Sequence, residues 1–419
     1  MKKRIIFISV LIIFLLGIAT VFYIKYTNEQ EKLREEKRIE ELIVDIKSHY
    51  NKYVITTEET VAYKKDNEEY IEYGKINKDI KLTLTEQEID ENTKYFHIED
   101  LDLYISHESV EPTDEYTKDD RYTNYIYFNK NITTKDTTTF YNSDDEYLYM
   151  INESFDFKVL VNDTDKYGVV YNDELVYIKS EDVENIYDNQ NTDLKNKSRI
   201  KTLTYHFIYN PETYWCNQSI CQSFEQFESH LKYIRENDYF TLRLDEMEMY
   251  LDGKIQIPEK SIVLTIDDGT IFDIGAIDLL EQYDVDATLF VITGVVDTKE
   301  FKSDNLHLES HTDNMHNQYE CAGYGSQGGG ILCLPEEQVL QDLKISQEKL
   351  GGSKYFAYPF FDFNDRAISL LKQAGFNMAF IGQYTTDGYA YPNQTDKYKI
   401  PRKTIFSFTS MNEFISYLN

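Results

Sequence analysis

The sequence is short of basic residues. Lys and Arg number 43 against 74 Asp and Glu, so the formal net charge is −31 over 419 residues. A surface of that sign repels phosphate, which argues against nucleic acid as a partner. Apolar side chains are not scarce, because hydrophobic residues make up 41% of the chain and aromatic residues 15%. The length and composition therefore indicate two or three domains with real cores.

Cysteine is also scarce, with four in the chain and no CxxC spacing among them. The missing spacing argues against a zinc site built from four cysteines. The cysteines fall into two close pairs, Cys216 with Cys221 and Cys321 with Cys333. An even number in an exported chain suggests disulfides, and we expect these two pairings.

Charge is absent from residues 5–24, IIFISVLIIFLLGIATVFYI, which follow three basic residues. Twenty apolar residues of helix are long enough to cross a bilayer. A cleaved signal peptide is the alternative, but its apolar region is usually shorter and Ala19-Thr20-Val21 is a poor cleavage site. We therefore expect an uncleaved transmembrane anchor over residues 1–25. Because the basic end stays in the cytoplasm, the rest of the chain is expected outside the cell.

Residues 26–49 contain no Gly or Pro and are rich in Glu and Lys, which predicts a solvated juxtamembrane helix. Residues 50–190 show short β-type runs between Asn, Asp and Thr turns. Within them, 95-YFHIEDLDLYISHESVE-111 is similar to 167-YGVVYNDELVYIKSEDVE-184. The repeat predicts two small β modules. Their layout resembles bacterial SH3-like domains, which implies binding to cell-wall polymer, and a plain β spacer is the alternative.

Strand and helix patterns alternate over residues 200–419, which predicts parallel strands covered by helices, as an open doubly wound sheet or a barrel. Polar residues stand where these strands end. His206 closes the first strand, Asp267 and Asp268 end 261-SIVLTIDD-268, and two histidines follow 306-LHLES-310. The carboxyl ends of strands form the rim on which barrel active sites are built.

Two of these residues, His311 and His316, lie five apart in 310-SHTDNMH-316. In a regular helix they would point about 140° apart, so a loop is needed to bring both to one ion. Two imidazoles and the carboxylate of Asp268 make a three-ligand metal site with an open position for water. Such an ion would also offset the repulsion between the adjacent carboxylates of Asp267 and Asp268.

The motif TIDDG resembles the TFDDG motif of polysaccharide deacetylases, the carbohydrate esterase family 4 or NodB-homology group. SHTDNMH resembles the second, histidine motif of that family, and 356-FAYPFFDFN-364 resembles the third, in which a glycine usually stands where this chain has Phe361. The longer histidine spacing and the strand 203-LTYHFIYN-210 are similar to the branch that de-N-acetylates poly-β-1,6-N-acetylglucosamine. The resemblance covers residues 200–419 and implies a distorted (β/α) barrel.

The resemblance also implies a role for each site residue. Asp267 is the expected catalytic base and His206 the expected acid. Asp268, His311 and His316 are the expected metal ligands, and the cofactor is a divalent ion, zinc first, with cobalt, nickel or iron as alternatives. The third motif often has a preceding arginine, for which Lys354 is the nearest cation here. Arg402, in 400-IPRKTI-405, is an alternative partner that would orient Asp267.

These features predict a membrane-anchored, metal-dependent deacetylase of N-acetylglucosamine polymers. The histidine spacing favours an exopolysaccharide substrate, whereas the β modules favour peptidoglycan. An O-acetyl esterase acting on a glycan would use the same site. A protein that binds cell-wall glycan without turnover is the alternative from a different class, and the complete Asp/Asp/His/His/His set argues against it.

Overall fold

The structure, a computed structural model, describes residues 2–116, 121–122, 125–188, 199–317, 329–382 and 387–418, with side chains from residue 16 onward. Two compact units make up the chain. The first comprises Met1–Tyr122, Ile132–Phe157 and Asp165–Ile186, and the second comprises Thr123–Asn131, Lys158–Thr164 and Tyr187–Asn419. Two short segments of the predicted β region thus belong to the second unit. Cys321 of the predicted pair Cys321–Cys333 lies outside the described residues.

The first unit begins with one continuous helix, α1 (Lys2–Ser48). It runs through the predicted anchor and the predicted juxtamembrane helix. Among residues with described side chains, no helix is long and apolar enough to span a membrane. The predicted anchor, residues 5–24, lies mostly outside that part of the chain, because its side chains are described only from Leu16.

The first unit is otherwise built of short strands. A three-stranded sheet has the order β4-β1-β7, and a larger antiparallel sheet runs β13-β14-β9-β10-β3-β2-β6-β5. The strands are β1 (Tyr53–Thr56), β2 (Thr60–Asp66), β3 (Glu69–Ile76), β4 (Lys81–Thr83), β5 (Tyr95–Ile98), β6 (Leu103–Ser106), β7 (Val110–Pro112), β8 (Asn131–Thr134), β9 (Thr138–Tyr141), β10 (Tyr147–Ile151), β11 (Asp156–Lys158), β13 (Lys166–Tyr171), β14 (Glu174–Lys179) and β15 (Val183–Tyr187). The strand between β11 and β13 in sequence, β12 (Val161–Asn162), belongs to the second unit.

The two segments with similar sequences have the same order of elements. Each starts with an antiparallel hairpin, β5–β6 in one and β13–β14 in the other. Each then passes through a three-residue 3₁₀ turn, His107–Ser109 or Ser180–Asp182, into a further strand. The likeness of these modules to SH3-like domains stays a prediction.

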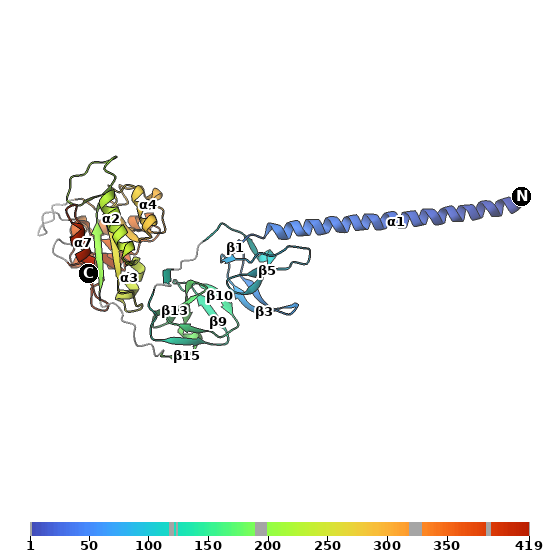
Figure 1. Ribbon diagram of the computed structural model, residues 1–419, viewed down its shortest axis with the longest axis horizontal. Helices are drawn as coiled ribbons and strands as arrows, with labels where there is room; N and C mark the ends of the chain where they lie inside the picture. The colour runs from blue at the N-terminus through green and yellow to red at the C-terminus, as the bar shows by residue number, and fades with distance from the viewer. Residues whose placement is uncertain are drawn as a thin grey trace. The chain divides into compact units, whose positions relative to one another are not determined.

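The second unit is a mixed α/β domain around a half-barrel sheet (Figure 1). Six strands run parallel in the order β24-β23-β22-β21-β20-β16. The strands of this unit are β16 (Ile200–Tyr205), β17 (Phe207–Tyr209), β18 (Cys221–Ser223), β19 (Phe240–Thr241), β20 (Ser261–Asp268), β21 (Ala287–Val291), β22 (Leu306–Ser310), β23 (Tyr355–Ala357), β24 (Met378–Phe380), β25 (Tyr389–Ala390) and β26 (Lys403–Thr404).

Six helices cover this sheet: α2 (Phe224–Glu236), α3 (Leu244–Leu251), α4 (Gly275–Tyr283), α5 (Glu336–Lys349), α6 (Asp365–Ala374) and α7 (Met411–Leu418). The α2 helix begins as its sequence predicts, with Ser223 and Gln226 forming a capping box. Apolar faces of α2, α4 and α7 pack on β16, β20 and β21, and those of α5 and α6 pack around Phe356 and Phe376. The parallel strands therefore end along one edge, where polar residues can converge.

One short segment, residues 400–404, connects the two edges of the half-barrel. At its start Ile400 pairs with Phe380, the last residue of β24. At its end β26 pairs in parallel with β16, matching Lys403 to Leu203 and Thr404 to Thr204. Arg402 lies between these two pairings and is fully buried, which directs its side chain to the inside of the sheet.

Candidate active site

The paired aspartates are the last two residues of β20, a strand buried along its whole length. Asp268 has a φ of +74° and Gly269 one of +72°, so the chain turns sharply where the strand ends. Left-handed backbone is costly for a residue with a side chain, and its presence at a strand end is a feature often found at functional sites. Asp267 and Asp268 are 1% and 7% exposed, so both carboxylates need compensating partners.

The partners of Asp268 are the two predicted histidine ligands. The Nε2 atoms of His311 and His316 lie 3.3 and 3.1 Å from the same oxygen, Oδ1 of Asp268. Ligand atoms of all three residues lie within 4.8 Å of one another. Burial alone would raise the pKa of Asp268, but hydrogen bonds from the two histidines outweigh it and hold that pKa well below its usual range.

This donor set fits a divalent cation. The Nδ1 atom of His311 lies 2.8 Å from the carbonyl oxygen of Ala357, so the ring donates there and turns Nε2 toward Asp268. Metal-binding histidines generally use their second nitrogen in this way. Two imidazole nitrogens and one carboxylate oxygen form the three-ligand set that catalytic zinc sites use.

The loop required by the histidine spacing is held from α5. Both carboxylate oxygens of Asp342 accept backbone N–H groups, from Asp313 at 2.8 Å and Asn314 at 2.7 Å. Thr312 has a φ of +77°, which turns the chain directly after His311. His316 therefore returns to face His311, and their ring centroids lie 4.7 Å apart.

Asp267 is held by an arginine rather than by the histidines. Arg402 donates from Nη1 and Nη2 to the two oxygens of Asp267 at 2.6 and 2.7 Å. It also donates to the hydroxyl of Thr265 and the carbonyl of Ile381, each at 3.2 Å. Burial would raise the pKa of Asp267, but Arg402 and the histidines lower it below its ordinary value. The carboxylate is therefore ionised and fixed in orientation.

His206 follows β16 directly and faces the same space. Its ring lies edge-on to Phe361 with 5.8 Å between centroids, and its buried Nδ1 atom has no hydrogen-bond partner among the described residues. Burial lowers the pKa of His206 below its ordinary value, and the charges of Asp267 and Asp268 partly oppose that effect. The ring therefore lines the same pocket as the two carboxylates.

The third motif forms a 3₁₀ turn, Pro359–Phe361. Phe360 and Phe361 have φ values of +57° and +60°. Glycine adopts that backbone region at little cost, which gives a physical reason for the glycine usual at the second of these positions. In this chain a phenylalanine adopts the conformation, and its ring borders the pocket and contacts the guanidinium of Arg402, 5.6 Å from the ring centroid.

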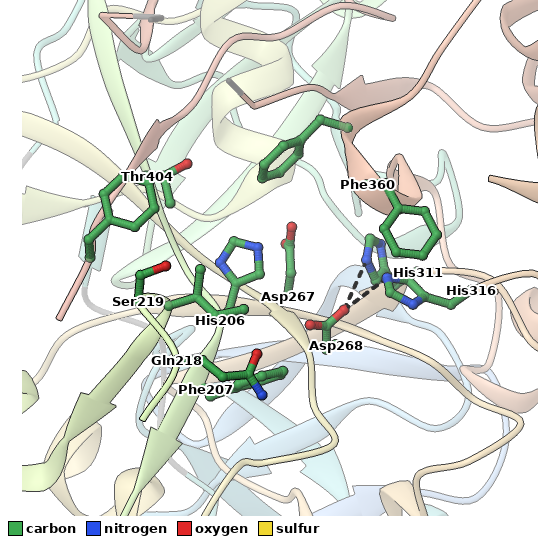
Figure 2. A pocket seen from close by; sticks show the side chains of 13 residues that line it. His206, Phe207, Gln218, Ser219, Asp267, Asp268, His311, His316, Phe360 and Thr404 are labelled. Carbon is green, nitrogen blue, oxygen red and sulfur yellow. Dashed lines mark ion pairs between the residues drawn. The ribbon is translucent and has the colours of Figure 1, made fainter. Parts of the chain in front are cut away.

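These residues surround one pocket of about 450 Å³, shown in Figure 2. Asp268, His311, His316 and Phe360 form one side of it. Gln218, Ser219 and Thr404 form the other, with His206 and Asp267 between the two sides. The complete lining is His206, Phe207, Gln218, Ser219, Ile220, Asp267, Asp268, His311, His316, Phe360, Phe361, Thr404 and Phe406. Sequence reasoning missed Gln218, Ser219, Thr404 and Phe406, which belong to no motif.

Comparisons with known proteins agree with this geometry. Residues 254–379 match the model of the polysaccharide deacetylase family. A poly-β-1,6-N-acetyl-D-glucosamine N-deacetylase of Staphylococcus aureus (strain MRSA252) is 29% identical over 208 residues, which cover 44% of this chain and 67% of that protein.

Two solved structures are also similar. The de-N-acetylase of Aggregatibacter actinomycetemcomitans has a TM-score of 0.44 and 20% identity, covering 52% of this chain and 99% of its own. IcaB of Ammonifex degensii has the same score and identity, covering 53% and 97%. By its match to the family model and its similarity to the staphylococcal enzyme, the chain carries a polysaccharide deacetylase domain and is a hydrolase.

Proposed function

We propose that this protein is a metal-dependent N-deacetylase of poly-β-1,6-N-acetylglucosamine or a closely related cell-surface polymer. One observation carries the proposal: a three-ligand set, an arginine-held aspartate and an unpaired histidine nitrogen all face a single pocket. Amide hydrolysis needs these three functions together, since the attacking water must lose a proton and the leaving nitrogen must gain one.

Asp268, His311 and His316 would hold the ion. A divalent cation bound there supplies Lewis acidity, which polarises the acetyl carbonyl and acidifies a water molecule. Zinc is the first candidate because of the mixed imidazole and carboxylate donors, with cobalt, nickel and iron as alternatives.

Asp267 and His206 divide the proton transfers. Arg402 keeps Asp267 ionised at neutral pH, so its carboxylate accepts the proton of the attacking water. An aspartate with a lowered pKa is a weak base, and it is effective only toward a water that is already acidified. His206, which lies beside Asp267 between the two sides of the pocket (Figure 2), would donate a proton to the departing amine.

A polymeric substrate is supported by the openings around the ligands. A second hollow of about 400 Å³ shares Phe207, Asp268 and His316 with the main pocket. Space therefore continues past the ligand set on both sides, as a chain of sugars requires. The name of the staphylococcal relative supplies the β-1,6-linked N-acetylglucosamine polymer as the candidate.

The placement of the enzyme at the cell surface is part of the proposal. The uncharged run 5–24 would anchor the chain in the membrane, with the catalytic unit outside the cell. The disulfide between Cys216 and Cys221 supports an oxidising location. The β modules of the first unit would hold the enzyme against cell-wall polymer.

The test is release of acetate from β-1,6-linked N-acetylglucosamine oligomers by the purified chain supplied with zinc or cobalt. Wild type should release acetate and leave free amines, and Asp267→Asn and His206→Asn should each lose at least about 100-fold in rate. His307→Ala is the control, because His307 lies on β22 outside the pocket lining and pairs with Asp286 at 3.0 Å. Absence of acetate release by metal-loaded wild type from any N-acetylglucosamine polymer would refute the proposal.

A further inference from the structure

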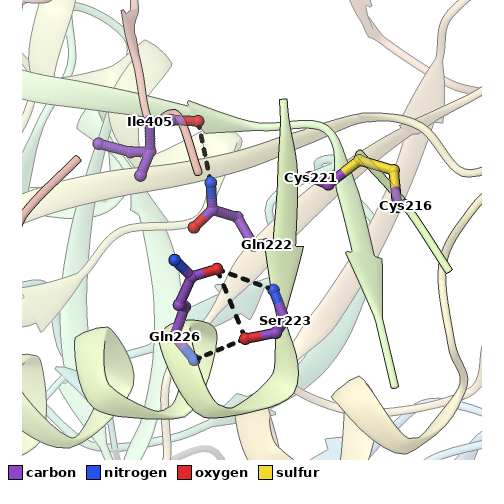
Figure 3. The surroundings of a disulfide bond; sticks show 6 residues. All are labelled: Cys216, Cys221, Gln222, Ser223, Gln226 and Ile405. Carbon is purple, nitrogen blue, oxygen red and sulfur yellow. Dashed lines mark hydrogen bonds between the residues drawn. A yellow bond between two sulfur atoms is a disulfide. The ribbon is translucent and has the colours of Figure 1, made fainter. Parts of the chain in front are cut away.

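The side of the pocket away from the metal ligands has no part in the chemistry described above. It is built by two loops, residues 216–222 and 404–409, the second of which starts at Thr404, the last residue of β26. A disulfide, Cys216–Cys221, closes the first loop, and Figure 3 shows it beside Gln222, which donates to the carbonyl of Ile405 at 3.4 Å. The N–H of Ser407 donates to the carbonyl of Ser219 at 2.7 Å. The two loops therefore form one braced wall.

The wall is anchored to the body of the domain as well. Gln226, the capping residue of α2, donates from Nε2 to the carbonyl of Ser407 at 2.8 Å. Phe207 donates its N–H to the carbonyl of Ile220 at 3.3 Å, which ties the first loop to β17. Because the wall is already held in place by these bonds, it loses little conformational entropy when a ligand binds to it.

One buried hydroxyl on this wall is unused within the protein. Thr404 is 4% exposed, lines the pocket, and its Oγ1 atom has no hydrogen-bond partner among the described residues. Figure 2 shows this side chain on the same side as Ser219. A buried hydroxyl without a hydrogen-bond partner is energetically disfavoured, so a ligand that forms a hydrogen bond with it is bound more tightly. Gln218 and Ser219, both exposed, add further polar groups beside it.

An aromatic strip continues from the pocket outward. Phe406 lines the pocket, and Phe408 stacks on it with 5.1 Å between ring centroids and 7° between planes. Phe408 is 70% exposed. A single exposed apolar ring needs no explanation, but a ring stacked on a pocket-lining ring extends the apolar lining of the pocket to the surface. Aromatic rings flanked by a few polar groups are the usual lining of small-molecule sites.

We propose that this wall is a subsite for the sugar units next to the one that is deacetylated. The hydroxyl of Thr404 bonds to a hydroxyl of the neighbouring pyranose, whose apolar face packs on Phe406, and the following unit packs on Phe408. The inference deepens the proposed function, on which it rests for the identity of the polymer. It predicts that the catalytic efficiency rises with the length of the substrate oligomer. This dependence should come from Thr404, Phe406 and Phe408, which neither bind the metal nor transfer a proton.

The test compares N-acetylglucosamine oligomers of one to five units. In wild type, kcat/KM should rise with length. Thr404→Val and Phe408→Ala should each lower kcat/KM for the longer oligomers by about tenfold, mainly through KM, because one hydrogen bond or one stacked ring is lost. Tyr391→Ala is the matched control, since Tyr391 is another exposed aromatic, 37% exposed, that follows β25 near the opposite end of β16. Thermal unfolding of each variant confirms its fold.

A second measurement separates the subsite from the proposed function. Oligomer binding is titrated calorimetrically in the Asp267→Asn background, where turnover is absent. Weaker binding of long oligomers by Thr404→Val and Phe408→Ala supports the subsite even if wild type releases no acetate, and in that case the proposed function alone fails. Equal binding by all variants, or an effect that is the same for one unit and five, overturns the subsite. So does a Phe408→Ala variant that loses only its binding to phospholipid vesicles, because that result assigns the ring to a membrane surface.

Discussion

Replacing Arg402 with methionine should be the most damaging single change away from the metal ligands. The guanidinium is fully buried and holds Asp267, itself 1% exposed, through two bonds of 2.6 and 2.7 Å. Removing one partner of such a pair leaves an uncompensated buried charge, which costs about 3–5 kcal/mol of unfolding free energy. Deacetylation should fall by about 100-fold, because the carboxylate loses its fixed orientation.

The pH dependence of this loss has a definite sign. In wild type, Arg402 holds the pKa of Asp267 below its ordinary value, so the pair contributes stability at neutral pH. Without the arginine, the main effect that lowers this pKa is lost, so burial raises the pKa of Asp267 above its wild-type value. The variant is then destabilised most at pH above the raised pKa and recovers as acid neutralises the carboxylate. The difference in stability between wild type and Arg402→Met should therefore shrink as the pH falls from 7 to 5.

Urea unfolding followed by circular dichroism at the two pH values measures both effects. Arg235→Met is the matched control, because Arg235 pairs with Asp284 at 3.3 Å with both side chains more than half exposed, and such pairs contribute at most about 1 kcal/mol. The double variant Asp267→Asn with Arg402→Met should be more stable than the sum of the single losses predicts. This prediction would be refuted if Arg402→Met lost less than about 1 kcal/mol of unfolding free energy, or if the two substitutions were strictly additive. Either result would mean that Arg402 and Asp267 are not a coupled buried ion pair.

Further predictions concern the metal ligands, their support and the core. His311→Ala and His316→Ala should each lose bound metal and turnover together, measured by elemental analysis and acetate release. Asp342→Ala should weaken metal affinity by about 10–100-fold in a chelator competition, because Asp342 holds the loop before His316. Burial lowers the pKa of His230 to about 4, so acid should remove about 3 kcal/mol of stability between pH 6.5 and 4, and His230→Gln should abolish that slope.

The convergence of the candidate site residues could be predicted because it follows from parallel strands. His206, Asp267 and Asp268, and His311 each stand where a strand ends, and ends of parallel strands share one edge. Some helix starts depend only on local sequence: Ser223 forms a capping box at the start of α2, and Ser410 and Glu413 form reciprocal hydrogen bonds at the start of α7. These features depend on neighbours in sequence or on one simple rule of topology.

Other parts of the site depend on contacts between residues far apart in the sequence, which no local sequence pattern predicts. Arg402 reaches Asp267 across 135 positions because residues 400–404 connect β24 to β16. The sequence offered Arg402 only as one alternative to Lys354. Thr404 and Phe406 escaped notice for the same reason, since a threonine that ends a two-residue strand and a phenylalanine two residues later have no distinctive spacing. Their relevance appears only when the loop closed by Cys216 and Cys221 is placed opposite the metal ligands.

The segment 400–404 therefore has two roles, one in the fold and one in the site, and mutations can separate them. Its backbone joins the sheet edges, while two of its side chains serve the site, because Arg402 holds Asp267 and Thr404 lines the pocket. Arg402 acts through a charge that the buried aspartate requires, so its loss changes stability and rate together. The Thr404 hydroxyl has no hydrogen-bond partner in the part of the chain that the structure describes, so it can be removed without a folding penalty. A variant that keeps its stability but loses its preference for long oligomers would thus trace chain-length recognition to this one strand.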